Sequence, residues 1–286
     1  MAGCGEEKGF ALIFLIPSLH MPITSPVSLN QINQDDFAKL DYQVMRHAFQ
    51  SQNELGRLCD EVIYQNDLTN RLEAAGLPTL KEVPVTVTYR DFVKIYSLDL
   101  VVANAGIYEL KTATALVAAH EAQLLNYLFL CGSRHGKLIN FRPINVESRF
   151  FNTTLSQTDR GQFAVEADGW LERDQTDLVF REVLLGLLRD WGCWLGLDLY
   201  TEALIHFAGG EGAVAVLLPL TQGNCNLGMQ RFLLLNPETA FRVTSLVEGT
   251  ADYEQHLRLL LRLSPLRTIH WVNLARNRVQ LTSLTK

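Results

Sequence analysis

Residues 96–112 read YSLDLVVANAGIYELKT, and this stretch decides which fold we expect. Asn104-Ala105-Gly106 supplies the chemistry of a hairpin turn, because glycine tolerates the positive φ that such turns require. The apolar residues on either side predict two strands, Phe92–Ala103 and Ile107–Thr112. We therefore expect an antiparallel hairpin in the first half of the chain.

Three charged side chains converge on one face of this hairpin. Side chains alternate along a strand, so Glu109 and Lys111 share a face, and the turn brings Asp99 roughly opposite Glu109. Two carboxylates in a partly buried patch repel each other and need a counter-cation. Oxygen ligands completed by water suit Mg²⁺ or Mn²⁺, beside which Lys111 can hold or deprotonate an attacking water. Taken alone, the pattern is equally typical of a solvated strand face.

The segments around the hairpin alternate between helical and strand periodicity. Asp36–Ala75 has helical apolar spacing and ends at Gly76-Leu77-Pro78, a glycine cap followed by proline. Val83–Tyr89 alternates apolar and polar residues, which predicts a strand. His120–Leu130 predicts a helix, and Lys137–Phe141 predicts a last short strand. The expected order is helix, three strands, helix, strand.

Two helices carry polar side chains where a plain core helix would carry Leu or Ala. Gln123 and Tyr127 are four residues apart and share a face, as do Glu61 and Tyr64 at a spacing of three. We expect these helices to complete the site, with Tyr64 as a packing aromatic whose hydroxyl lies at the rim. His120, close to a helix start, is interpreted as a cap or an exposed residue.

An Asp on one strand, Glu-x-Lys on the next and Gln-x-x-x-Tyr on a helix resemble the PD-(D/E)XK nuclease superfamily, in its RecB-like branch. The resemblance is closer to the GxxExxY proteins of that superfamily. Their defining helix is similar to Gly56-Arg57-Leu58-Cys59-Asp60-Glu61-Val62-Ile63-Tyr64, and a later one resembles His120–Leu128. The resemblance covers roughly Phe37–Phe141. Leu58 stands where the name-giving pattern has a glycine, a departure that concerns the geometry of the helix start rather than metal ligands.

This resemblance implies an αβββαβ core and a metal-dependent phosphodiesterase site. It implies that a Mg²⁺ or Mn²⁺ ion is served by three carboxylates and one main-chain carbonyl, those of Glu61, Asp99, Glu109 and Leu110. Lys111 would act on the water, and Gln123 and Tyr127 would steady the substrate or the lysine.

The same order of elements starts again in the second half of the chain. The expected elements are a helix at Val179–Trp191, a strand at Leu199–Phe207, a strand pair at Phe232–Asn236 and Phe241–Leu246, a helix at Tyr253–Leu263 and a strand at Ile269–Leu274. A shift of 133 residues maps Tyr96–Thr112 onto Met229–Ser245 without a gap. For the leading helix we infer a shift of 116, which leaves about 17 extra residues (133 minus 116) in the second copy.

We therefore expect an α/β protein of two tandem restriction-endonuclease-like units, each with a mixed central sheet flanked by helices. The expected divisions are a poorly ordered extension over 1–35, a unit with an intact site over 36–141, a polar linker over 142–176 that includes a short strand at 162–165, and a degenerate unit over 177–286.

The second copy has lost the charged set. The 133-residue shift replaces Asp99, Glu109, Lys111, Gln123 and Tyr127 by Phe232, Arg242, Thr244, His256 and Leu260. Phenylalanine cannot bind Mg²⁺ and an arginine reverses the charge, so we predict a catalytically dead copy with a binding or scaffolding role. Its last part carries five arginines, which form either a phosphate-binding stripe or a solubilising face: Arg258, Arg262, Arg267, Arg276 and Arg278.

Composition limits the remaining possibilities. The 286 residues carry a net charge of -6, without the basic balance of most passive nucleic-acid binders. The longest apolar runs are far shorter than the ~20 residues of a membrane helix, so we expect no membrane association. The 5 cysteines are scattered, which favours reduced thiols in a cytoplasmic protein. Met1–His20 makes a poor signal peptide, and we expect the working protein to start near Met21.

The sequence leaves three functional hypotheses. The first is a metal-dependent nuclease, active in the front unit only, that hydrolyses phosphodiester bonds of DNA or RNA with metal-activated water. The second is a non-catalytic nucleic-acid- or partner-binding protein that retains a vestigial nuclease fold. The third treats Glu109 and Lys111 as a surface ion pair, which contributes only ~0–1 kcal/mol and leaves Gln123, Tyr127 and Glu61 unexplained.

Overall fold

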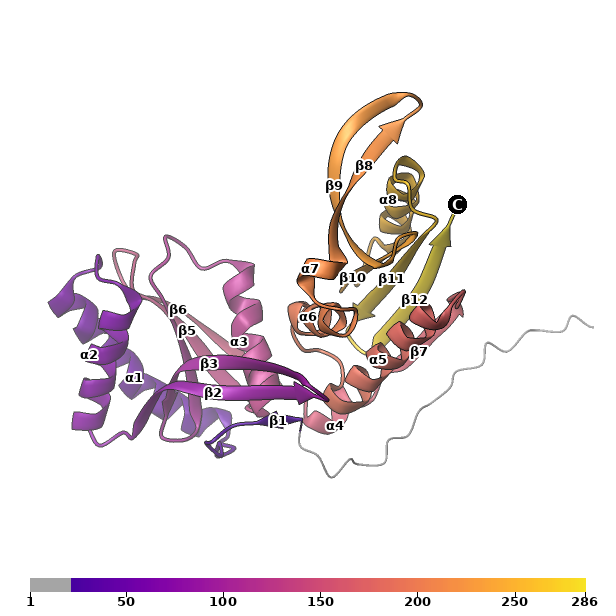
Figure 1. The fold of residues 1–286 in the computed structure, drawn as a ribbon. Helices are drawn as coiled ribbons and strands as arrows, with labels where there is room; N and C mark the ends of the chain where they lie inside the picture. Colours follow the sequence, from indigo (N-terminus) through magenta and orange to yellow (C-terminus); the bar gives the residue numbers. More distant parts are fainter. Residues whose placement is uncertain (1–21) are drawn as a thin grey trace, which may run out of the picture. The chain divides into compact units, whose positions relative to one another are not determined.

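The computed structural model describes residues 22–286, which divide into two compact units. The N-terminal unit comprises the described residues up to Asp159, and the C-terminal unit runs from Arg160 to Lys286 (Figure 1). The expectation of a dispensable segment before Met21 lies outside the described residues. The part of the expected extension that is described joins the N-terminal unit, because Ile23 and Thr24 pair with β2 and Asn33 caps the first helix.

The N-terminal unit is built on one six-stranded sheet. Its elements are β1 (Ile23–Thr24), α1 (Gln34–Leu55), α2 (Glu61–Ala74), β2 (Thr79–Tyr89), β3 (Phe92–Val102), β4 (Gly106–Lys111), α3 (Ala118–Cys131), β5 (His135–Asn140) and β6 (Glu147–Asn152). The strands lie in the order β1-β2-β3-β4-β5-β6. All neighbours are antiparallel except β4 and β5, which are parallel and connected through α3.

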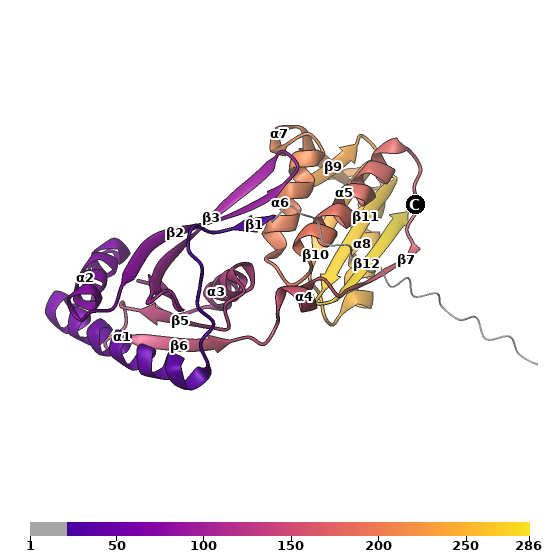
Figure 2. The same ribbon diagram turned by 90° about the horizontal axis from the view of Figure 1, so that it is seen from below.

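Helices cover both faces of this sheet. The helices α1 and α2 pack on the face that carries Leu100, Tyr108 and Leu110, and together they form the main apolar core. On the other face, α3 packs against β5, where a side chain at Gly136 would collide with Leu124 and Leu128 of the helix. The strands β2 and β3 extend beyond β4 as a long arm, along which β1 pairs with β2 (Figures 1 and 2). Asp99 lies in β3, one residue beyond the recorded β3–β4 pairs.

The C-terminal unit has its own six-stranded sheet. Its elements are β7 (Ala164–Gly169), α5 (Gln175–Trp191), α6 (Leu197–Phe207), α7 (Glu211–Val214), β8 (Ala215–Gln222), β9 (Cys225–Asn236), β10 (Thr239–Thr244), α8 (Thr250–Leu263), β11 (Thr268–Ala275) and β12 (Arg278–Thr285), with α4 (Gln157–Arg160) at the boundary. The strand order is β7-β12-β11-β10-β9-β8, with β10 parallel to β11 and β7 parallel to β12. The α/β class, with two mixed six-stranded sheets flanked by helices, is confirmed.

The two units share the connectivity of five strands, β2 to β6 in one and β8 to β12 in the other. Local hydrogen bonds repeat as well. The hydroxyl of Tyr64 donates to the carbonyl of Gly56, and that of Tyr200 donates to Gly192, each at 2.6 Å. Gly56 and Gly192 end their helices at φ 74° and 77°. These two hydrogen bonds lie 136 residues apart, which differs from the shift of 116 expected for the leading helix. A comparison of the units by position in the fold therefore sets α5 beside α1 and α6 beside α2.

Several expected elements need correction. The strand expected at Leu199–Phe207 is helix α6, because its buried residues Leu199, Tyr200, Ala203 and Leu204 recur at helical spacing. The helical region 36–75 is two helices, separated at Gly56. The segment 142–176, interpreted as a linker with a short strand at 162–165, supplies β6 to one sheet and β7 to the other, and β7 overlaps that short strand. The strands β8 and β12 are additional to those expected.

Two further observations concern the expected surroundings of the protein. Among the described residues, no helix is both long and apolar enough to cross a membrane. The four cysteines within residues 22–286 are free thiols.

Candidate active site

The candidate site begins where β3 separates from β4. The recorded pairs of these strands run from Val102↔Gly106 to Leu100↔Tyr108, so Asp99 and Glu109 are the next opposed residues. Beyond the last pair, the Asp99 side chain replaces a main-chain acceptor of β3. Its Oδ2 accepts a hydrogen bond from the amide of Leu110 at 2.7 Å. The structure thus brings Asp99 beside β4, as the hairpin pattern predicts.

Glu109 is the most buried charged group of the site. Its side chain is 1% exposed, and its Oε1 accepts from Nζ of Lys111 at 2.7 Å. Its Oε2 is buried without a hydrogen-bond partner among residues 22–286. Leaving a buried oxygen unpartnered costs free energy, so this atom requires an explanation other than folding.

Burial and mutual repulsion shift the pKa values of both carboxyls upward. Desolvation raises the pKa of Asp99 to about 6, against the lowering effects of the Leu110 amide and Lys111. Desolvation and the neighbouring Asp99 raise the pKa of Glu109 to about 8, although Lys111 opposes this. For Lys111, desolvation lowers the pKa, but Glu109 and Asp99 outweigh it and the pKa rises. The chain by itself therefore supplies too little positive charge to keep both carboxyls ionised.

The helix α3 contributes the expected pair on one face. Nε2 of Gln123 donates to the hydroxyl of Tyr127 at 2.9 Å. Burial raises the pKa of Tyr127 to about 12, with Glu109 and Asp99 contributing, so the phenol stays protonated. His120 caps the start of this helix, because its Nδ1 accepts from the amide of Val117.

Glu61 is the first residue of α2 and acts on the site through its charge. It raises the pKa values of Asp99, Glu109 and Lys111, but within the described chain it has no hydrogen bond to any of them. Arg142, just after β5, holds the start of this helix in place, because it donates to the carbonyls of Arg57 and Cys59 that precede the helix. Tyr64, one turn further on, is fully buried and stacks on Phe141, as expected for a packing aromatic.

The oxygen donors of the site suit a divalent metal only in part. Within residues 22–286, no three His, Cys, Asp or Glu side chains lie close enough together to form a metal site. Asp99 and Glu109 nevertheless fit a hard cation, because they are oxygen donors, one oxygen of Glu109 has no partner, and their raised pKa values report missing positive charge. Glu61 would have to move closer to act as a third ligand.

Two supporting residues were missed by sequence reasoning. Gln65 donates to the main-chain carbonyl of Asp99 at 3.1 Å and to Glu82, thereby joining α2 to β3 beside the site. Asn140 bridges the amide and carbonyl of Ala113, which fixes the chain just after Lys111. The position of Gln65, four residues after Glu61, was a usable signal, as was the apolar-Asn-apolar triplet around Asn140.

Only some of the five arginines in the last part of the second unit are available to bind phosphate. Arg258 pairs with Glu254, and Arg267 and Arg278 also pair with glutamates. Ion-paired arginines on an exposed surface carry little net charge toward a ligand, so these three favour the solubilising interpretation.

Comparison with known proteins gives one match. A family model described as the PD-(D/E)XK nuclease superfamily matches residues 38–151. This range contains the hairpin, α2, α3 and the last two strands of the N-terminal sheet. No curated protein and no solved structure matches the chain.

Proposed function

We propose that the N-terminal unit is a metal-dependent nuclease that hydrolyses phosphodiester bonds of DNA or RNA by means of metal-activated water. The observation that carries this proposal is the buried Glu109 carboxyl, which has one unpartnered oxygen and lies beside Asp99. A buried carboxyl with an unpartnered oxygen does not stabilise an apolar core, whereas a cation site needs a carboxylate oxygen that is free to bind the ion. The similarity of residues 38–151 to a nuclease superfamily supports the same chemistry.

In this proposal Asp99, Glu109 and Glu61 hold Mg²⁺ or Mn²⁺, with the main-chain carbonyl of Leu110 as a further ligand. When bound, the ion supplies Lewis-acid polarisation of the phosphate and an acidified water. An all-oxygen set of carboxylates, a carbonyl and water suits hard cations of this kind.

The remaining residues act on the water and the substrate. Lys111 has a raised pKa and is an ammonium at neutral pH, so it is suited to holding the water and offsetting charge on the phosphate. Tyr127 keeps its proton and, positioned by Gln123, can donate to a phosphate oxygen. A role of Lys111 as base would require the pKa of its ammonium to fall when the metal replaces the charge of the carboxylates.

The test is cleavage of labelled single- and double-stranded DNA and RNA in Mg²⁺ or Mn²⁺, with metal binding measured in parallel by calorimetry. We expect Glu109→Gln to bind the metal more weakly and to cleave at least 100-fold more slowly. Glu121→Gln is the matched control: it makes the same change in the first turn of α3, where Glu121 pairs with Arg149 outside the site. Metal binding without cleavage by the wild type would select the non-catalytic alternative, and cleavage retained in Glu109→Gln would refute the assignment.

We further propose that the chain is a GxxExxY-type protein and that the C-terminal unit is a degenerate copy of the N-terminal one. Glu61 at the start of α2 and the buried Tyr64 support the first point. The shared strand connectivity and the repeated Tyr–Gly hydrogen bonds support the second. The free cysteines support the cytoplasmic location that we expect.

A further inference from the structure

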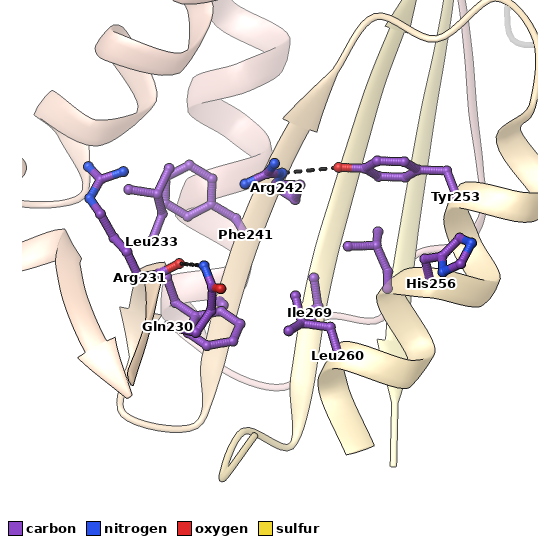
Figure 3. A pocket seen from close by; sticks show the side chains of 12 residues that line it. Gln230, Arg231, Leu233, Phe241, Arg242, Tyr253, His256, Leu260 and Ile269 are labelled. Atoms are coloured by element: carbon purple, nitrogen blue, oxygen red, sulfur yellow. Dashed lines mark hydrogen bonds between the residues drawn. The ribbon is translucent and has the colours of Figure 1, made fainter. Parts of the chain in front are cut away.

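The C-terminal unit contains a pocket of about 270 Å³ between β9, β10 and α8 (Figure 3). Its floor is apolar and is formed by Phe232, Leu257, Leu260 and Ile269. Phe232 and Ile269 belong to the core of this unit, so the floor is rigidly held. The volume is close to the lower end of the range of small-molecule sites, ~300–1,000 Å³.

The polar residues around this floor are cationic or neutral. Arg242 from β10 and Tyr253 from α8 meet across the pocket, where Nε of the arginine donates to the tyrosine hydroxyl at 3.0 Å (Figure 3). Gln230 and His256 complete the rim, and no lining residue is acidic. Of the carboxylates near the rim, Asp252 lies 3.5 Å from Nε2 of His256, Glu254 pairs with Arg258, and Glu211 pairs with Arg231.

Arg242 retains most of its donors. Within residues 22–286 it has no carboxylate partner, and only its Nε is used, by Tyr253. Its exposed guanidinium therefore offers both terminal amino groups, and Tyr253 still has its own hydroxyl proton to donate. A guanidinium fork with a neighbouring hydroxyl matches the oxygens of a phosphate.

The position of this pocket in the fold explains its charge. Arg242 and Phe232 are the next residues beyond the last recorded β9–β10 pair, Phe241↔Leu233. Glu109 and Asp99 stand in the same relation to the last β3–β4 pair. The helix α8 follows β10 as α3 follows β4, so the pocket is the counterpart of the candidate active site. Where that site presents acids to a cation, this one presents a cation and an apolar floor.

We propose that this pocket binds a nucleoside phosphate, with the phosphate on Arg242 and Tyr253 and the base against the apolar floor. A planar base stacked on aromatic and aliphatic side chains contributes without sequence preference. That an anion binds follows from the pocket alone; the choice of a nucleotide rests on the proposed nuclease function of the N-terminal unit. The nucleotide is either free or part of a strand, and the two sources present the same groups.

The test uses the full chain in EDTA, so that no divalent metal occupies the N-terminal site. One arm titrates the four ribonucleoside monophosphates by calorimetry, and the other titrates a labelled single-stranded oligonucleotide by fluorescence anisotropy. We expect Arg242→Glu to weaken binding at least tenfold. Arg262→Glu is the matched control, since it makes the same charge reversal on α8 at an exposed residue outside the pocket lining.

A second variant, Leu260→Trp, fills the floor without changing charge and should also weaken binding, with both variants checked for native thermal unfolding. If Arg242→Glu weakens binding of the monophosphates, the ligand of the pocket is a free nucleotide. If it weakens binding of the oligonucleotide alone, the ligand is a nucleotide within a strand. Absence of binding in both arms overturns the proposal, as does an equal loss in Arg242→Glu and Arg262→Glu. Failure of the nuclease proposal is detected separately, by the cleavage assay in Mg²⁺ with Glu109→Gln.

Discussion

Binding of Mg²⁺ to the N-terminal site should release about one proton per ion at pH 7. Desolvation and the Asp99 carboxyl raise the pKa of Glu109 to about 8, and desolvation raises that of Asp99 to about 6. At pH 7 Glu109 is therefore about nine-tenths protonated and Asp99 about one-tenth. Both protons must leave before the carboxylates can bind the ion, because only the ionised forms are strong ligands.

The assay is calorimetric titration of Mg²⁺ into the full chain at pH 7 in two buffers, Tris and PIPES, that differ in enthalpy of ionisation. The difference in apparent enthalpy measures the protons released. At pH 9, Glu109 is only about one-tenth protonated, so the release should fall to about a tenth of a proton. Glu109→Gln should bind more weakly and release almost nothing at pH 7.

Two results would refute this reasoning. Tight Mg²⁺ binding without proton release at pH 7 would mean that Glu109 is already ionised in the metal-free chain. Equal release at pH 7 and pH 9 would mean that the proton comes from another group.

Three further outcomes are expected. In the folded chain Glu109 keeps its proton to about pH 8, whereas in the unfolded chain it loses the proton near pH 4.5, so the free energy of unfolding falls as the pH rises through this window. Thermal unfolding of the metal-free chain should therefore show that Glu109→Gln is stabilising at pH 7, by at most roughly 3 kcal/mol, and not at pH 4. The Asn140 side chain bridges the amide and carbonyl of Ala113 after β4, and the Asn273 side chain bridges those of Leu246 in the C-terminal unit. In urea titrations, Asn140→Ala and Asn273→Ala should therefore each lower the free energy of unfolding by roughly 2–3 kcal/mol. A loss of less than roughly 0.5 kcal/mol would contradict this. Desolvation lowers the pKa of His270 despite its bond to Asp177, so the C-terminal unit should lose stability as the pH falls below about 6.5, and His270→Gln should flatten that dependence.

The fold could be predicted wherever apolar periodicity and turn chemistry agree. The hairpin around Asn104, the helix before Gly132 and the parallel strand after it all follow from local signals. The strand predicted at Leu199–Phe207 was wrong because a short apolar run fits both the strand period and the helix period. Contacts with neighbouring elements decide between the two. Within residues 142–176, the short strand expected at 162–165 overlaps the start of β7. The strand β6 was missed because it lies at the sheet edge, where its half-exposed residues give no clear apolar pattern.

The candidate site was predictable in its residue types but not in its electrostatic state. Alternation on β4 places Glu109 and Lys111 on one face whatever the partners are. The unpartnered oxygen of Glu109, the capture of the Leu110 amide by Asp99 and the wider separation of Glu61 depend on how β3 leaves the sheet and where α2 begins. No local pattern encodes those distances.

The amino-acid order alone determined the identity of the charged set, its common strand face and the loss of that set at Phe232 and Arg242 in the second half. Only the tertiary structure decided that α5 and α6 take the places in their unit that α1 and α2 take in theirs, and that Arg242 lines a pocket with an apolar floor. The physical reason is that periodicity acts between neighbours along the chain. Burial, pKa shifts and cavities depend on side chains that the fold assembles from distant segments.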